Sequence, residues 1–182
     1  MSTFEISRAA PQDALKILDY CKAVGAETDC LTFGQEGVSF TAEKEAEYLK
    51  SIEHSNTQLY LVAKQEGEII ATAVYTGFLK PRLAHRGEIS ISVRKAMWGN
   101  HVGSQLMEKL IDFAQNTAGA EIISLEVRSD NERAIALYRK FGFQKIGCFK
   151  GYLKINGTYI DCDIMNLYLK PPKMGVSLRA HL

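Results

Sequence analysis

The chain has 182 residues, of which 46% are hydrophobic and 24% are charged, an ordinary composition for a folded globular domain. Its 22 basic and 21 acidic residues leave a net charge of +1, so no overall field favours nucleic acid or an anionic membrane. No apolar run approaches the ~20 residues that span a bilayer, and residues 1–10 lack the apolar segment of a signal peptide. We therefore expect a cytoplasmic protein without a membrane or nucleic-acid partner, in which any anion site is local.

The 4 cysteines and 4 histidines are scattered along the chain without the spacing of metal ligands. No Cys-x-x-Cys pair occurs, so the sequence predicts neither a zinc site nor a disulfide framework. We expect reduced thiols and no bound metal.

Apolar residues recur at every second position in some segments and at helical spacing in others. The turns at 65–68 and at Asn156-Gly157 predict hairpins. Thr41 suits a helix N-cap, and Gly25 and Gly142 suit helix ends. The predicted elements, in chain order, are a strand at 4–7, helices at 14–24 and 42–52, strands at 58–64, 69–79 and 88–93, a helix at 102–116, a strand at 121–127, a helix at 131–141, and strands at 143–147 and 152–169.

This order, βααβββαβαββ, predicts an α/β fold with hairpins at both ends of its sheet. No repeat, low-complexity segment or linker interrupts it. We expect residues 1–170 to form a single domain and residues 171–182 to form a peripheral tail.

The segment 93–104 leaves a predicted strand, crosses a loop with small residues and opens an amphipathic helix. The first turn of a helix carries unpaired N–H groups and a partial positive charge. Gly99 and Gly103 allow a phosphate or pyrophosphate to approach this backbone closely. The same glycines also suit a tight turn with close helix–strand packing, so this segment alone leaves both interpretations open. It is neither a Walker A loop nor Gly-x-Gly-x-x-Gly, which disfavours a nucleotide kinase or a dinucleotide enzyme.

The segment 125–143 joins a predicted strand to a predicted helix. Ser129 and Glu132 have the spacing of a capping box, which starts the helix near Asp130 or Asn131. Tyr138 follows Asn131 by about two helical turns and shares its face. Taken singly, Asn131 is equally well explained as a helix cap and Tyr138 as a core residue.

Together, the two segments resemble the GNAT superfamily of acetyltransferases. The strand, loop and helix of 93–104 are similar to its acyl-CoA pyrophosphate motif, and 131–143 is similar to its second signature, Asn-x-x-Ala-x-x-Leu-Tyr-x-Lys-x-Gly-Phe. The resemblance covers residues 3–170 and implies a mixed, mostly antiparallel central sheet flanked by helices. The first motif differs from the family's usual pattern at Trp98, which replaces a basic or amide residue, and at His101, which replaces a glycine.

The resemblance implies an N-acetyltransferase in which a primary amine directly attacks the thioester of acetyl-CoA, without a metal. It implies that the pantetheine arm pairs with the strand backbone at residues 91–93, and it suggests a homodimer. The implied cofactor-binding residues are Ile91, Ser92, Val93, Trp98, Gly99, Asn100, His101, Val102, Gly103, Ser104, Asn131 and Tyr138.

Tyr138 is the expected proton donor to the leaving thiolate, because a phenol stays protonated at neutral pH. Glu88 is the first candidate for the base that takes the amine proton, and Glu126 is the second; a structural role fits either carboxylate as well. Glu27 and Asp29, in a predicted loop, are candidate contacts to a cationic small-molecule or peptide amine, and solvated loop charges explain them equally well.

A second hypothesis keeps the fold but not the reaction: a non-catalytic acyl-CoA-binding sensor that uses the same cradle. The replaced glycine at His101 is its main support. A third, a nucleotide-binding regulator, is disfavoured by the near-neutral charge and the missing Walker loop.

Overall fold

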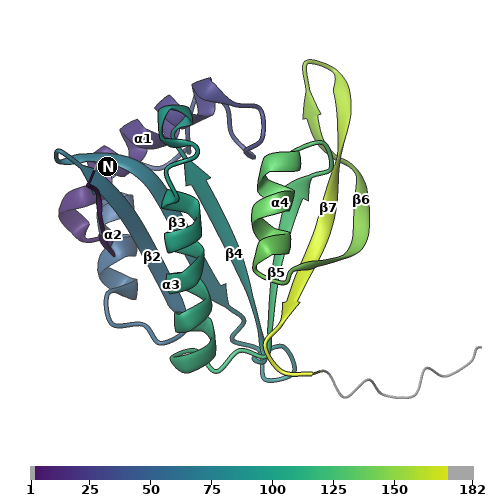
Figure 1. Cartoon of the computed structure of the whole chain (residues 1–182). Coiled ribbons are helices and arrows are strands. Elements are labelled where there is room, and N and C mark those ends of the chain that lie inside the picture. The colour runs from purple at the N-terminus through teal and green to yellow at the C-terminus, as the bar shows by residue number, and fades with distance from the viewer. Residues whose placement is uncertain (1–2, 172–182) are drawn as a thin grey trace, which may run out of the picture.

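The computed structural model describes residues 3–171, so the expected tail lies outside the described residues except for Pro171. Within this range, seven strands form one mixed sheet in the order β1-β2-β3-β4-β5-β7-β6, flanked by helices (Figure 1). The order of the elements confirms the predicted βααβββαβαββ arrangement. The strands are β1 Glu5–Arg8, β2 Gln58–Gln65, β3 Glu68–Gly77, β4 Arg86–Val93, β5 Ile122–Arg128, β6 Gln144–Ile155 and β7 Thr158–Tyr168, and the helices are α1 Ala14–Glu27, α2 Ala42–Ile52, α3 Val102–Asn116 and α4 Glu132–Lys140, with short 3-10 turns η1 Pro11–Asp13 and η2 Lys95–Met97.

Two hydrophobic cores lie on opposite faces of the sheet. In β2, Leu61 belongs to the core under α3 and α4, whereas the next residue, Val62, belongs to the core under α1 and α2. Neighbouring strand residues point to opposite faces, so the helices form two separate layers. Figure 1 shows α3 and α4 in front of the sheet and α1 and α2 behind it.

β4 and β5 are the one parallel pair within residues 3–171, and they stay together only briefly. Their Cα partners are limited to Arg86 with Ile122, Gly87 with Ile123 and Glu88 with Ser124. Beyond this point β4 and β5 diverge, as Figure 1 shows near the middle of the sheet. One backbone edge of β4, from Ile89 to Val93, is therefore left without a strand partner.

Gly25 does not end α1 as predicted, because the helix continues to Glu27. A Cβ atom at Gly25 would lie only 2.0 Å from the backbone oxygen of Gly34. The glycine therefore permits close contact between α1 and the loop after it, a packing role that local sequence does not distinguish from a helix stop.

The start of α4 also differs in detail from the prediction. Ser129 and Glu132 do not form a capping box, because the Ser129 hydroxyl donates to Asp163 Oδ1 in β7 at 2.6 Å. Asn131 is the N-cap instead, and its Oδ1 accepts from the backbone N–H of Ala134 at 3.1 Å. The predicted start of the helix is correct, but a contact distant in sequence occupies the serine.

Other local predictions are confirmed. Thr41 caps α2, and Gly142 follows α4 with a φ of 91°. Asn156 and Gly157 have φ values of 49° and 82°, as a two-residue hairpin turn requires. β6 is continuous from 144 to 155, however, because irregular pairing with β7 bridges the break predicted between 147 and 152.

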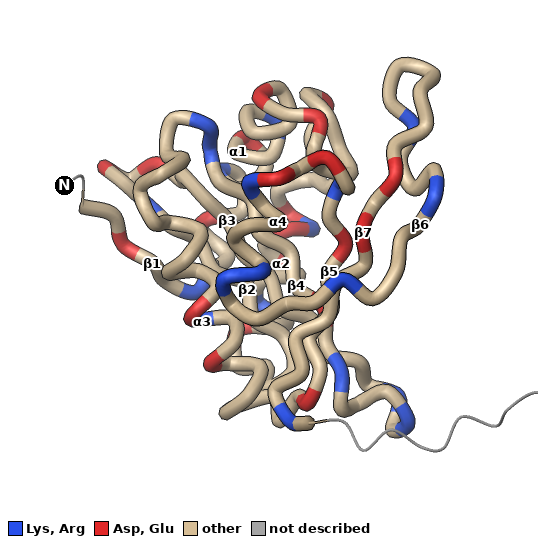
Figure 2. The backbone as a smooth tube through the Cα atoms, turned by 45° about the vertical axis from the view of Figure 1, so that its right-hand side comes forward, with Lys and Arg blue, Asp and Glu red and all other residues tan. Residues whose placement is uncertain are grey.

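Basic and acidic residues are interspersed along the described backbone (Figure 2). None of the helices within residues 3–171 is long and apolar enough to cross a membrane.

Candidate active site

The free edge of β4 presents the backbone of alternate residues. Arg94 N donates to Ile70 O at 2.9 Å, which makes this a hydrogen-bonded position between the end of β4 and the start of β3. In an antiparallel ladder the N–H and C=O groups of successive residues point alternately toward the partner strand and away from it. Ile91 and Val93 therefore turn their backbone groups toward the diverging β5, whereas the backbone of Ser92 faces β3. Two of the three predicted pantetheine partners lie on the open edge.

The side chain of Ser92 has a different role. Its hydroxyl lies 2.9 Å from the Tyr20 hydroxyl in α1 and 3.0 Å from the Thr72 hydroxyl in β3. Burial raises the pKa of Tyr20, so its phenol remains protonated. The three hydroxyls fix α1 against the sheet on the face that also carries Glu88.

The first turn of α3 is uncapped. Thr41 caps α2 and Asn131 caps α4, but no side chain of residues 3–171 accepts from the start of α3. The backbone N–H groups of its first three residues, 102–104, therefore remain available as donors. Gly103 also lets this turn pack on α4, since a Cβ there would lie 3.3 Å from Leu137 Cδ2. The glycine thus serves both interpretations that the sequence left open, the cradle and the close packing.

His101, the N-cap residue of α3, adopts a left-handed conformation with a φ of 61°. This region costs an L-residue roughly 1–2 kcal/mol and costs glycine almost nothing. The backbone thus explains why the usual family motif has a glycine here. Gly99, with a φ of 83° and open space around its Cβ position, meets the same requirement in the preceding loop.

Trp98 is held beside the end of β4. Its indole Nε1 donates to Val93 O at 3.0 Å, which engages one of the carbonyls on the open edge. The Arg133 guanidinium lies 4.4 Å from the centre of the Trp98 ring, and Lys95 Nζ lies 6.0 Å from it. The two cations concentrate positive charge near the uncapped turn in a chain whose net charge is only +1. Sequence reasoning missed Arg133 because no short spacing links it to the loop.

Glu27 is the last residue of α1 rather than a free loop residue. Its carboxylate pairs with Arg94 Nε at 2.7 Å and accepts from Lys95 N at 2.7 Å. Burial favours the neutral carboxyl, but the hydrogen bonds from Lys95 and Arg94 outweigh it and keep the pKa of Glu27 below its usual value. Glu27 therefore joins α1 to the beginning of the loop between β4 and α3.

Asp29 lies in the exposed loop after α1. Its backbone oxygen accepts from Arg128 Nη1 at 3.0 Å, which ties this loop to the end of β5. The loop therefore spans from α1 to the strand that diverges from β4.

Tyr138 is buried in α4, with its ring centre 5.8 Å from that of Phe143. Burial raises the pKa of its phenol to about 12. No residue in 3–171 hydrogen-bonds to its hydroxyl. The Tyr138 phenol is thus protonated and able to donate a hydrogen bond. Its neighbour in the chain, Leu137, packs against Gly103 in the first turn of α3.

Two carboxylates lie where the strands part. Glu88 is the last β4 residue paired with β5, and Glu126 lies two positions beyond its partner Ser124 on the same face. Burial, and secondly the charge of Glu88, raise the pKa of Glu126. Both predicted candidates for the base therefore lie close together. Within residues 3–171, no cluster of His, Cys, Asp and Glu could hold a metal ion.

Comparison with known proteins identifies the family. Residues 18–143 match the model of the acetyltransferase (GNAT) family. The chain belongs to this family. This match confirms the resemblance seen in the sequence. The chain is similar to an acetyltransferase of the GNAT family from Streptococcus pneumoniae, with a TM-score of 0.87 and 29% identity, over 91% of this chain and 99% of that one.

The structure of yncA from Salmonella typhimurium, which contains acetyl-CoA, has the same fold, with a TM-score of 0.80 at 19% identity over 97% of this chain and 99% of that one. Among curated relatives, the L-amino acid N-acetyltransferase AaaT of Escherichia coli is 32% identical over 58% of this chain and 65% of its own length. The N-alpha-acetyltransferase RimI of Mycobacterium tuberculosis is 40% identical over 38% of this chain and 41% of its own. The matched part of the chain thus spans less than two thirds of either GNAT relative.

We predict that His101→Gly will raise the free energy of unfolding by up to about 1 kcal/mol, because glycine removes the left-handed strain. Gly99→Ala is the matched control: its Cβ meets no neighbour, so any loss of stability reports the backbone conformation alone. Urea denaturation measures both. Destabilisation by His101→Gly would mean that the imidazole makes a stabilising contact.

Proposed function

We propose that this GNAT protein transfers an acetyl group from acetyl-CoA to a primary amine by direct attack, within one domain formed by residues 1–170. The observation that carries the proposal is the β4 edge at Ile91 and Val93, which lacks a strand partner and is joined by residues 94–101 to the uncapped first turn of α3. An exposed strand edge suits an amide-containing arm, and a helix N-terminus suits a diphosphate. We further infer a homodimer, as the resemblance implies, and a cytoplasmic location, as the sequence composition suggests.

When bound, acetyl-CoA supplies the acetyl thioester. The N–H groups of Val102, Gly103 and Ser104 would hold its diphosphate, with Arg133 and Lys95 adding positive charge. In the preceding loop, Gly99 and Asn100 would leave room for the diphosphate to reach these N–H groups. His101 would do the same, because its side chain is exposed to solvent. Asn131 uses Oδ1 to cap α4, which leaves its Nδ2 as a donor.

Tyr138 would act on the leaving thiolate. Its pKa of about 12 is well above the ~8.5 of a thiol, so full transfer of its proton would be uphill. A hydrogen bond from the phenol to the developing negative charge does not carry this cost. We therefore assign Tyr138 as a hydrogen-bond donor to the thiolate.

Glu88 and Glu126 together would accept the amine proton. The raised pKa of Glu126 makes it a stronger base than an ordinary glutamate, and the charge of Glu88 contributes to that rise. Glu27 is already paired with Arg94, so we assign it to positioning the loop and keep Asp29 as the contact for a cationic acceptor.

The names of the relatives support an amine acceptor: one is an L-amino acid N-acetyltransferase and another is an N-alpha-acetyltransferase. The alternative is an acyl-CoA sensor without turnover, for which His101 remains the motivating feature. The left-handed backbone at His101 weakens the sensor hypothesis. Histidine in place of the family's glycine costs local strain, but it leaves the N–H donors of α3 in place.

An acetyl-transfer assay tests the function. With acetyl-CoA and a panel of primary amines, the wild-type protein should release free thiol only when an amine is present. Tyr138→Phe should lower kcat on the order of 10²-fold and leave CoA affinity unchanged, because it removes only a donor used in the transition state. Product is measured by mass spectrometry and affinity by calorimetry.

CoA binding without transfer to any amine would favour the sensor. A Tyr138→Phe variant that turns over at the wild-type rate would remove the phenol from the mechanism.

The pH profile of kcat/KM tests the base. Activity should rise as Glu126 ionises, so a raised pKa places the acidic limb above the usual range for a glutamate. Glu88→Gln removes a neighbouring negative charge and should shift that limb to lower pH, whereas Glu126→Gln should abolish it. The same amine is used with all variants, so that the contribution of the amine's own ionisation to the pH profile is the same in each. An unchanged limb in both variants would exclude this pair as the base.

A further inference from the structure

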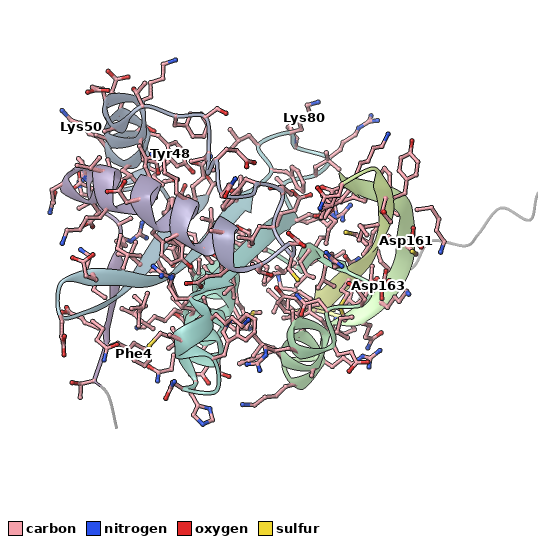
Figure 3. All side chains as sticks on the ribbon, turned by 90° about the horizontal axis from the view of Figure 1, so that it is seen from above. Phe4, Tyr48, Lys50, Lys80, Asp161 and Asp163 are labelled. Carbon is pink, nitrogen blue, oxygen red and sulfur yellow. The ribbon has the colours of Figure 1, made fainter. Side chains whose placement is uncertain are left out.

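A second site is formed by a cavity of about 450 Å³ on the face of the sheet covered by α1 and α2. This volume is typical of small-molecule sites. Figure 3, which views the molecule from above, labels Tyr48 beside these two helices. The lining residues come from α1, the loop that follows it, α2, β2 and β3: Ile17, Cys21, Val38, Phe40, Lys44, Glu45, Tyr48, Tyr60 and Val74.

The lining is largely apolar and aromatic. Phe40 and Tyr48 are 59% and 37% exposed, respectively, which is unusual for such large rings. Tyr60 contributes a third ring from the sheet. Aromatic faces carry negative charge density and attract organic cations within about 6 Å.

Glu45 is the exception in this lining. Its side chain reaches the cavity, yet the residue is only 6% exposed. No residue in 3–171 forms a hydrogen bond or ion pair with its carboxylate, and Lys44 at the rim does not pair with it. Burial raises the pKa of Glu45, as expected for a carboxyl without a partner. Its oxygens are not among the fully buried polar atoms of the described residues, so the carboxylate is accessible from the cavity, where a cationic ligand is the natural counterpart.

The position of Glu45 in α2 supports this interpretation. Glu45, Leu49 and Ile52 are the buried residues of the helix and follow the i, i+4, i+7 spacing of its core-facing stripe. A carboxylate therefore occupies a position where packing alone favours an apolar residue.

The cavity shares its sheet face with the proposed base. Tyr60 pairs with Val74, and Val74 pairs with Ser90 of β4, so these side chains form one row across the sheet. Glu88 is the diagonal neighbour of Val74, which places their Cα atoms about 7–8 Å apart. A ligand in the cavity can thus extend along this face toward Glu88 and Glu126.

We propose that this cavity holds the non-reacting end of the acceptor, a cationic nitrogen carried on an apolar chain, with the ammonium paired to Glu45 among the rings of Phe40, Tyr48 and Tyr60. The acceptor class is therefore a diamine, one nitrogen of which is held at Glu45 while the other reacts near Glu88. This assignment rests on the proposed acetyl transfer, but the cation site can be tested without it.

Binding is tested with hexyltrimethylammonium, which cannot be acetylated. It should raise the Tm of the wild-type protein and of Glu47→Gln, a control that removes an exposed carboxylate from the same helix. Glu45→Gln should lose most of this shift and, without ligand, should be at least as stable as wild type, because burial disfavours the charged form of Glu45. An equal ligand shift in Glu45→Gln would overturn the proposal, as would no shift in wild type.

Turnover tests the acceptor class. The wild type should prefer hexamethylenediamine over hexylamine by at least tenfold in kcat/KM and should reject aminocaproate, whose distal charge is negative. Glu45→Gln should abolish the preference for the diamine, measured as the ratio of kcat/KM for the two amines, whereas Glu47→Gln should keep it. Equal use of the two amines by wild type would overturn the assignment.

The two proposals fail in different ways. If hexyltrimethylammonium binds at Glu45 but no amine is acetylated, the result supports the cation site and contradicts the proposed acetyl transfer. If hexylamine is acetylated but the quaternary cation does not bind, the result supports acetyl transfer and contradicts the cation site.

Discussion

The short parallel pairing between β4 and β5 is the constraint on which the rest of the site depends. Three paired positions hold the strands together at Glu88, and their divergence then exposes the backbone of Ile91 and Val93. Had the pairing continued, β5 would occupy the edge that the proposal assigns to the cofactor arm. Apolar residues of β4 and β5 belong to the same hydrophobic core as those of α3 and α4, so both diverging strands are packed on this face of the sheet.

Contacts distant in sequence maintain the geometry at the end of this edge. Glu27 ties the end of α1 to Arg94 and Lys95, and Trp98 hydrogen-bonds to the Val93 carbonyl. These interactions set the path of the chain between β4 and α3, so the uncapped donors of α3 face the region where the strands part. The loop between β4 and α3 is thus positioned by charge and by an indole as well as by its glycines.

Patterns local in sequence predicted the order of the elements, the bounds of α2 and α3 and the hairpin turn at 156–157, because periodicity and turn chemistry act over a few residues. The roles of Gly25 and Ser129 were misread, since their partners, Gly34 and Asp163, are brought close only by the fold. The predicted cofactor residues stay predictions, although the ladder geometry favours Ile91 and Val93 over Ser92. Glu45 was missed despite a readable signal, its place on the apolar stripe of α2.

The structure of a complex with CoA would test the central claim most directly. The account predicts that the diphosphate accepts hydrogen bonds from the N–H groups of residues 102–104 and that the pantetheine amides pair with Ile91 and Val93. Lodging of the ligand elsewhere, or an imidazole of His101 in the place of the diphosphate, would contradict it.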